Sequence, residues 1–190
     1  PRSTPRPAAR RSSVGSWARQ SPQTATTWWL TGLPGAGKTT LAQALAAALR
    51  ERGEPACVID GDELRTGLCK DLGFDEASRA ENVRRAAHMA QLLNANAIHA
   101  VVAMVSPAAP ARAAAYATIG VDRCKEVHVS TPLEVCEKRD PKGLYARARA
   151  NQLTQMTGIQ AGYEAPGSPA LRIDTSQTEL QVAVQQLLRA

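Results

Sequence analysis

The chain has 190 residues, of which 44% are hydrophobic and 21% are charged, a size and composition typical of a single globular domain. No apolar run reaches the roughly 18 residues that a membrane-spanning helix needs, so the composition excludes an integral membrane protein. Five of the 23 basic residues lie in residues 1–27, which hold no acid, so residues 28–190 carry 18 basic and 17 acidic side chains. This nearly neutral body lacks the basic face of a nucleic-acid-binding protein.

Residues 1–27 are rich in Pro, Ser and Arg and contain few large aliphatic side chains. Such a segment buries too little apolar surface to offset its ordering entropy, so we predict a basic, disordered N-terminal segment, with Trp17 suited to docking on the body. An organelle transit peptide has a similar composition, but we favour a natural tail or the remnant of an expression tag. The folded domain is predicted to span residues 28–190.

The four cysteines form neither a C-x-x-C pair nor a short cluster with histidine; they are Cys57, Cys69, Cys124 and Cys136. This spacing is not that of a zinc site. We therefore expect reduced thiols in a cytoplasmic protein.

From residue 28 the chain alternates between short apolar runs and longer segments with helical periodicity. In chain order we expect a strand at 28–31, a helix at 39–52, a strand at 56–59, a helix at 78–96, a strand at 98–105, a helix at 110–119, a strand at 126–130, a helix from 131, a strand at 171–173 and a helix at 178–189. Three helix starts show the spacing of a capping box, with the cap at Ser78, Thr131 and Ser176.

The strands are continuous apolar runs, which indicates that helices cover the sheet on both faces. We therefore predict a three-layer α/β fold, a P-loop NTPase fold with a central parallel sheet of about five strands. Residues 139–170 hold several Gly and Pro and show no steady period, so we expect a long mobile lid with one short helix.

A phosphate-binding loop follows the first predicted strand. Residues 32–39 read GLPGAGKT and fit the pattern G-x-x-x-x-G-K-[ST] in full. The glycines let successive N–H groups point at phosphate oxygens, and the helix that begins there adds its positive end. Lys38 supplies a charge for the β and γ phosphates and the Thr39 hydroxyl a ligand for Mg²⁺, so we expect ATP and Mg²⁺ at Gly32, Leu33, Pro34, Gly35, Ala36, Gly37, Lys38, Thr39 and Thr40.

The class of P-loop protein follows from what the rest of the sequence contains. A turn that binds nothing is disfavoured, because the motif follows a strand and opens an amphipathic helix. The N-K-x-D signature of GTPases is absent, and the D-x-x-G string at 140–143 follows a helix rather than a strand. The third strand ends in Ser106-Pro107 and not in the acid of a motor ATPase. A small kinase that uses ATP remains.

Two aspartates follow the second predicted strand, Asp60 and Asp62. A carboxylate at the carboxyl end of a parallel strand faces the same crevice as the neighbouring P-loop. Asp62 could hold Mg²⁺ or accept the proton of an attacking hydroxyl. The alternative is that Asp60 or Asp62 caps the next short helix.

Several strings taken together identify a family. They are GLPGAGKT at 32–39, DGDELRTGL at 60–68, LGF at 72–74, SRAENVRR at 78–85, SP at 106–107 and TPLEVCEKRDPKGLY at 131–145. In this order they strongly resemble the adenylylsulfate kinases over about residues 28–190. The resemblance implies transfer of the γ-phosphoryl group of ATP to the 3′-hydroxyl of adenylylsulfate, giving 3′-phosphoadenylylsulfate and ADP. It also implies small-molecule substrates only and a homodimer.

The resemblance assigns roles to matching positions. Lys38, Asp62 and Ser106 correspond to the catalytic group, with Asp62 binding Mg²⁺ beside Thr39 and orienting the hydroxyl. Ser106 lies where a phosphoserine intermediate has been placed in the family, but we favour direct in-line transfer, for which the other groups suffice. The remaining substrate and nucleotide ligands implied are Arg65, Arg79 and Asn82 for the phosphosulfate and ribose, Phe74 for the acceptor adenine, Lys142 for the phosphates under the lid and Arg139 for ATP.

Five positions depart from the family pattern: Cys69, Ala108, Ala109, Ala146 and Met156. All are expected on the acceptor or lid side. Two alternatives therefore stay open, a related P-loop kinase for another anionic or nucleotide-like alcohol and a degenerate nucleotide-binding regulatory domain.

Overall fold

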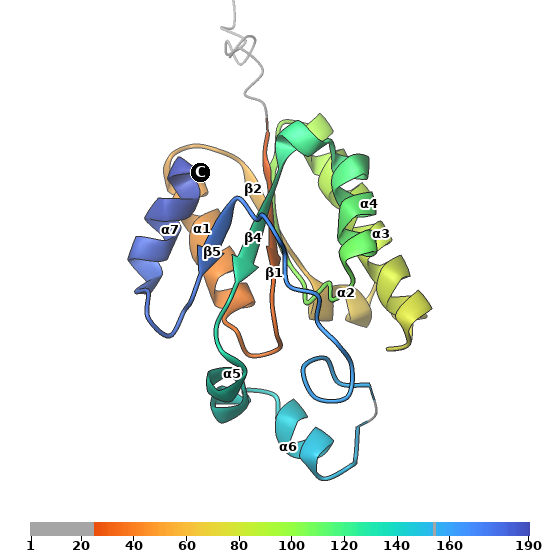
Figure 1. Ribbon diagram of the computed structural model, residues 1–190. Helices are drawn as coiled ribbons and strands as arrows, with labels where there is room; N and C mark the ends of the chain where they lie inside the picture. The colour runs from red at the N-terminus through yellow and green to blue at the C-terminus, as the bar shows by residue number, and fades with distance from the viewer. Residues whose placement is uncertain (1–24, 154) are drawn as a thin grey trace, which may run out of the picture.

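A computed structural model describes residues 25–153 and 155–190. The predicted disorder of the N-terminal segment and the docking of Trp17 concern residues outside the described ones. Five parallel strands form one sheet in the order β2-β3-β1-β4-β5 (Figure 1). They are β1 (Thr27–Thr31), β2 (Ala56–Asp60), β3 (His99–Ala103), β4 (Cys124–Val129) and β5 (Leu171–Ile173). The predicted fold class and strand number are thereby confirmed.

Helices cover both faces of the sheet, as expected for buried apolar strands. The helices are α1 (Lys38–Glu51), α2 (Gly61–Thr66), α3 (Glu76–Ala95), α4 (Ala109–Ile119), α5 (Leu133–Arg139), α6 (Leu144–Arg149) and α7 (Leu180–Arg189), with a 3-10 turn at Val121–Arg123. In Figure 1, α1 and α7 lie on one side of the sheet and α3 and α4 on the other, while α5 and α6 lie beyond the carboxyl ends of the strands.

The alternation of β1 divides the core into two halves. Trp28 and Leu30 pack in the cluster that contains α1 and α7, whereas Trp29 packs in the cluster that contains α3 and α4. Side chains of a strand point alternately to opposite faces, so neighbouring tryptophans serve opposite layers. None of the described helices combines the length and the apolar character that crossing a membrane requires.

The predicted helix starts are wrong in three places. The cap of α3 is Asp75, whose carboxylate accepts the N–H of Ser78 at 2.9 Å. The hydroxyl of Thr131 donates to Ala36 instead of capping α5. Helix α7 begins after Glu179 and has no side-chain cap, because Ser176 donates its hydroxyl to Asp174. In each case the side chain that the local pattern assigned to the cap makes a different hydrogen bond in the folded protein.

The strand order fixes where a ligand can bind. From β1 the chain crosses through α1 to β2, and from β3 it crosses through α4 on the opposite face to β4. The connections thus diverge at the carboxyl ends of the neighbouring strands β1 and β3, which opens a crevice at that edge. Strand β3 ends at Ala103, earlier than the predicted residue 105, and residues 104–107 leave the sheet toward this crevice.

Candidate active site

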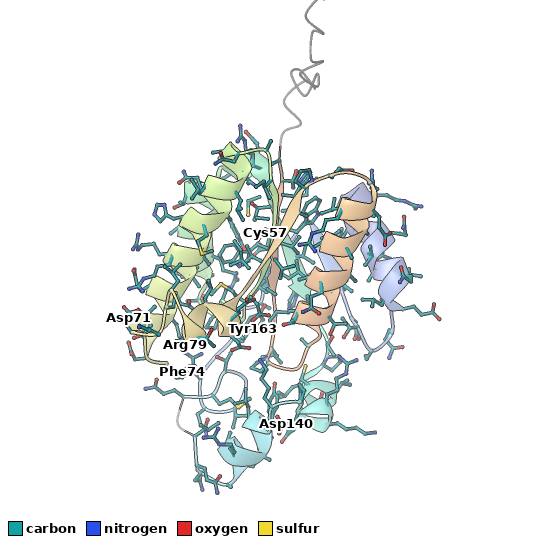
Figure 2. The ribbon with its side chains drawn as sticks, turned by 180° about the vertical axis from the view of Figure 1, so that it is seen from behind. Cys57, Asp71, Phe74, Arg79, Asp140 and Tyr163 are labelled. Atoms are coloured by element: carbon teal, nitrogen blue, oxygen red, sulfur yellow. The ribbon has the colours of Figure 1, made fainter. Side chains whose placement is uncertain are left out.

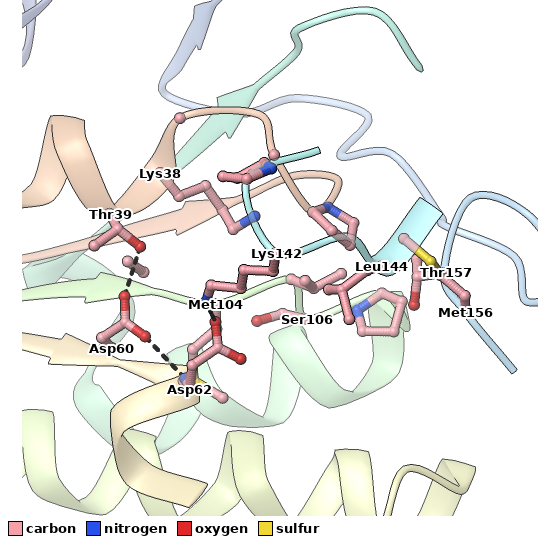
Figure 3. Close-up of a pocket in the computed structure, with 18 of the residues that line it drawn as sticks. Lys38, Thr39, Asp60, Asp62, Met104, Ser106, Lys142, Leu144, Met156 and Thr157 are labelled. Atoms are coloured by element: carbon pink, nitrogen blue, oxygen red, sulfur yellow. Dashed lines mark hydrogen bonds and ion pairs between the residues drawn. The ribbon is translucent and has the colours of Figure 1, made fainter. Parts of the chain in front are cut away.

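A cavity of about 1350 Å³ occupies the crevice. Its walls come from the P-loop, α2, the start of α3, the segment from α5 to α6, residues 152–153 and 155–157 and the residues that follow β3 (Figure 3). We call residues 104–107 the wall segment and residues 158–170, the last part of the predicted lid before β5, the return segment. Most predicted site residues line this one cavity: Pro34, Gly35, Gly37, Lys38, Thr39, Thr40, Asp62, Arg65, Phe74, Arg79, Asn82, Ser106, Arg139 and Lys142.

Two P-loop glycines have backbone conformations that other residues rarely adopt. The φ angles of Gly35 and Gly37 are 76° and 97°, in the left-handed region. A Cβ atom on Gly35 would also lie 2.9 Å from the carbonyl oxygen of Cys136. These glycines therefore allow the tight turn that leads directly into α1, whose N-cap is Gly37.

Three predicted nucleotide-binding residues, Gly32, Leu33 and Ala36, do not line the cavity. The carbonyls of Gly32 and Leu33 accept hydrogen bonds from Lys38 Nζ at 2.9 and 2.7 Å. The carbonyl of Ala36 accepts the hydroxyls of Thr131 and Thr175 at 3.0 and 2.8 Å. These positions hold the loop in shape through its main chain, a role that the motif by itself did not predict.

Lys38 is buried, with only 9% of its surface exposed. Desolvation opposes its charge, and although Asp62 and Asp60 favour the charge, the pKa falls from 10.5 to about 8. The ammonium group lies between the loop carbonyls and the cavity. The pKa of Lys38 therefore lies close to neutral pH, and its ammonium group is positioned to bind an anion.

Asp60 and Asp62 have different roles, although they stand two residues apart. Asp60 Oδ1 accepts the N–H groups of Asp62 and Glu63 at 2.8 and 3.4 Å, so it caps α2. Its Oδ2 accepts the Thr39 hydroxyl at 2.6 Å. The capping alternative thus holds for Asp60, and the sequence did not predict its contact with the P-loop. Asp62 has a side chain that is 69% exposed and open to the cavity.

The lid reaches Asp62 through one side chain. Lys142, 80 residues further along the chain, donates from Nζ to the carboxylate of Asp62 (Figure 3). Both groups line the cavity and both are more than half exposed, so the pair is solvated and weak. The predicted lid residue Lys142 and the predicted catalytic carboxylate of Asp62 are therefore neighbours.

An arginine pair and an aromatic ring line one part of the cavity. The Arg65 guanidinium lies 4.4 Å from the centre of the Phe74 ring and donates to the carbonyl of Gly73 at 2.8 Å. Arg79 Nε donates to the carbonyl of Phe74 at 2.6 Å, and its other nitrogens donate to the Thr157 hydroxyl and the Gln155 carbonyl. Phe74, beside Arg79 in Figure 2, is 62% exposed, so its ring is accessible to a ligand.

The amide of Asn82 faces the same cavity with an unsatisfied atom. Asn82 is 5% exposed, and its Oδ1 is the one buried side-chain polar atom without a hydrogen-bond partner among the described residues. A buried acceptor that lacks a donor is destabilising, so such an atom commonly marks a ligand contact.

Arg79 carries a positive charge in the same cavity. Partial burial and the neighbouring charge of Arg65 lower the pKa of Arg79, which keeps its charge.

A family model described as adenylylsulphate kinase matches residues 24–174. The chain belongs to the adenylylsulfate kinase family. The adenylyl-sulfate kinase of Shewanella amazonensis is 49% identical over 160 residues, 84% of this chain and 81% of the relative. That of Shewanella baltica is 47% identical over 171 residues, 90% of this chain and 83% of the relative.

A solved member of the family has the same fold. The APS kinase of Mycobacterium tuberculosis in complex with AMPPNP and APS superimposes with a TM-score of 0.84 and 43% identity. The match covers 87% of this chain and 96% of that one. The two chains therefore share the fold over most of their lengths.

The departures from the family pattern lie mostly outside the cavity. Of the five, only Met156 lines it, at 7% exposure. Cys69 is fully buried in the core beneath α3, and the positions 108, 109 and 146 belong to helix α4, its cap or helix α6. Four of the five positions therefore make no contribution to the lining of the cavity.

Ser106 forms part of the cavity wall under tight constraint. Its φ angle is 44°, a left-handed conformation that is unusual for serine. Trp29 Nε1 donates to its hydroxyl oxygen at 3.1 Å, and its carbonyl accepts from Arg112 Nη1 at 2.7 Å. Neither Trp29 nor Arg112 has a sequence pattern that predicts its contact with Ser106.

Arg139 is a further predicted site residue with a defined contact. It donates to the hydroxyl of Thr175 at 2.7 Å.

Proposed function

We propose that this protein transfers the γ-phosphoryl group of ATP to the 3′-hydroxyl of adenylylsulfate, releasing 3′-phosphoadenylylsulfate and ADP. The observation that carries the proposal is one cavity in which a complete P-loop, an accessible carboxylate and an arginine pair with an exposed ring face one another. The first binds a triphosphate, the second an alcohol, and the third an anionic nucleotide.

The donor side is built for a triphosphate. The P-loop amides precede α1, so the positive end of the helix and the Lys38 ammonium act on the same anion. A bound phosphate replaces the loop carbonyls as the partner of Lys38 and favours its charged form. Arg139, which lines the cavity beside Thr175, supplies a further cation for ATP.

The residues present suit Mg²⁺ that arrives with the nucleotide. Thr39, Asp60 and Asp62 provide hard oxygen donors at one edge of the cavity. Within the described part of the chain no three His, Cys, Asp or Glu side chains gather into a metal-binding group. This suits an ion held by one or two protein oxygens and by phosphate, and such an ion neutralises charge on the transferred group.

The acceptor side suits a flat, doubly anionic nucleotide. Arg65 and Arg79 supply fixed guanidinium donors for the phosphosulfate. The exposed face of Phe74 stacks on the adenine, and the unsatisfied Oδ1 of Asn82 accepts a ribose hydroxyl. Lys142 leaves the carboxylate of Asp62 for the substrate phosphates as the lid closes.

The transfer itself requires little covalent chemistry from the protein. The 3′-oxygen forms a bond to the γ phosphorus, the bond from that phosphorus to the bridging oxygen of ADP breaks, and the hydroxyl proton passes to Asp62. Ser106 acts through its place in the wall, where its hydroxyl oxygen accepts from Trp29, because direct transfer needs no phosphoserine. A homodimer and a cytoplasmic location remain predictions from the sequence.

The deciding experiment is an acceptor screen that measures ADP release with ATP and Mg²⁺. We expect turnover with adenylylsulfate and at most trace turnover with adenosine 5′-monophosphate, gluconate or no acceptor. Preference for another alcohol would favour the related-kinase alternative. Binding of ATP without turnover on any acceptor would favour a regulatory domain. The Lys38→Ala protein, in which the P-loop cation is missing, is the control for contaminating kinases.

A further inference from the structure

A buried arginine connects the wall segment to the return segment. Arg112, in α4, is 2% exposed. Its Nη1 donates to the carbonyls of Ser106 and Pro107 at 2.7 and 3.2 Å. Its Nη2 donates to the carbonyl of Glu164, in the return segment, at 2.7 Å. The wall of the cavity and residue 164 therefore share one rigid guanidinium group.

Glu164 makes a second connection of its own. Its N–H donates to the carbonyl of Pro107 at 3.0 Å, and its Oε2 accepts the N–H of Ala109 at 2.7 Å. Ala109 is the first residue of α4, and Ala108 at the N-cap position has no side chain that could cap the helix. Glu164 therefore caps α4 from a position 55 residues further along the chain.

The return segment is itself fixed next to Glu164. The Tyr163 hydroxyl shares a hydrogen bond of 3.0 Å with Thr31 of β1, and its ring stacks on His128 of β4 with centroids 5.9 Å apart. Figure 2 shows Tyr163 near the end of the sheet that faces the lid. Glu164 therefore starts from an anchored residue, whereas Ala108 and Ala109 contribute only methyl groups to the loop that it holds.

The wall segment that depends on this connection borders the catalytic acid. Met104 packs against Gly61, the residue before Asp62. A Cβ atom added to Gly61 would lie 3.0 Å from the Cγ atom of Met104. Figure 3 shows Met104 and Ser106 on the side of the cavity occupied by Asp62 and Lys142. A displacement of the wall would therefore alter the space in which the acceptor hydroxyl is oriented, with the P-loop left in place.

We propose that Glu164 is a positioning residue for the acceptor subsite. By capping α4 it sets the position of the wall segment against which adenylylsulfate rests, an inference that depends on the proposed function. Glu164 does not line the cavity, and it touches neither substrate in this role. Its effect therefore falls on acceptor binding and leaves binding of ATP unchanged.

The test compares Michaelis constants for the two substrates. Glu164 is exposed, so Glu164→Ala leaves no buried cavity and the variant should fold. We expect its KM for adenylylsulfate to rise about tenfold, the equivalent of one hydrogen bond, with KM for ATP and kcat within about twofold of the parent. Glu164→Gln retains an acceptor oxygen and should restore most of the affinity. Glu51→Ala, at the exposed end of α1, is the matched control.

A double-substitution cycle isolates the cap. Ala109→Pro removes the N–H that Glu164 accepts, at a first helical position that tolerates proline. In that background Glu164→Ala should cause no further rise in KM. An unchanged KM in Glu164→Ala, an equal rise for both substrates, or a full second rise in the Ala109→Pro background would overturn the inference. Inactivity of the parent protein toward adenylylsulfate would instead overturn the proposed function.

Discussion

Lys38 carries its charge in a place where burial opposes it. Its pKa in the folded protein is about 8, below the ordinary 10.5, because desolvation outweighs the attraction of Asp62 and Asp60. The unfolded chain therefore binds more protons between about pH 8 and pH 10.5, and the stability contributed at this position rises with pH across that window. Below pH 8 the folded protein bears the whole penalty, about 3 kcal/mol from the size of the shift.

The penalty predicts opposite effects on activity and stability. Lys38→Met should abolish turnover but raise the free energy of unfolding at pH 7 by up to about 3 kcal/mol, and this gain should fall to about half near pH 9.5. Urea denaturation at the two pH values measures both quantities. A loss of stability at pH 7 would show that the hydrogen bonds from Lys38 to the P-loop carbonyls outweigh its desolvation.

Asp62 is expected to matter for the reaction and not for the fold. Its side chain is 69% exposed and its contact with Lys142 is solvated, so Asp62→Asn should leave the melting temperature unchanged within about 1 °C. Turnover should fall by about a thousandfold, as for the loss of a general base. Steady-state ADP release and thermal melting check the two parts, with Asp122→Asn as an exposed control. Full activity in Asp62→Asn would remove the proposed role.

The P-loop residues illustrate what can be inferred from residues alone. The strict spacing from Gly32 to Thr39 predicted the loop and its helix, because few other sequences allow that turn. The partners of these residues were not predictable, since Thr131 and Thr175 approach Ala36 from about 100 and 140 residues away. Nor does any local pattern indicate that Asp60 both caps α2 and accepts the hydroxyl of Thr39.

Among the elements, α4 carries an ion pair between the buried Arg112 and the partly buried Glu126. Arg112 Nε lies 2.9 Å from Glu126 Oε1 on β4, and the same oxygen accepts the Tyr116 hydroxyl at 2.7 Å. Breaking such a pair leaves an uncompensated buried charge, which costs about 3–5 kcal/mol. Arg112→Met should therefore lower the free energy of unfolding by about that amount.

The matched double variant separates charge from packing. Arg112→Met combined with Glu126→Leu removes both charges, so it should recover the part of the loss in urea denaturation that comes from the unpaired carboxylate. The part that remains measures the hydrogen bonds from Arg112 to the carbonyls of Ser106, Pro107 and Glu164. A single variant that unfolds within about 1 kcal/mol of the parent would show that the pair contributes little.

The elements also show why local signals misplace boundaries. Ser78 and Asp75 both suit a helix cap, but the aspartate lies three residues earlier and accepts both the N–H and the hydroxyl of Ser78. The residues around Thr131 match a capping box, but the Thr131 hydroxyl donates to the carbonyl of Ala36 in the P-loop instead. Capping rules describe what a side chain can do within four residues, and tertiary contacts decide which option it takes.

For the whole molecule, the alternation of apolar runs and helices was sufficient to predict a parallel sheet of five strands. The strand order was not predictable from these runs, because each would fit several places in a buried sheet. The meeting of Asp62 with Lys142 and of Glu164 with Ala109 depends on that order and on the course of the lid. Distant contacts of this kind leave no periodic signal in the sequence.

Ligands should stabilise the whole molecule by mass action. At about 100 times its dissociation constant, ATP with Mg²⁺ should raise the free energy of unfolding by about 2.7 kcal/mol, and the melting temperature by about 5–10 °C in a chain of this size. Adenylylsulfate should add to this shift, because its proposed ligands Arg65 and Arg79 belong to α2 and α3 and not to the P-loop. Differential scanning calorimetry measures both shifts. No shift with either nucleotide would contradict the assignment of the cavity.

The opposite orientations of the two tryptophans on β1 have an optical consequence. The indole of Trp28 donates to Leu187 of α7, which does not line the cavity, whereas that of Trp29 donates to Ser106 in the wall. With Trp17 and Trp28 replaced by phenylalanine, Trp29 would be the single indole fluorophore of the chain. Its emission would respond to the polarity around Ser106, so filling of the pocket could be timed by stopped-flow fluorescence without an added dye.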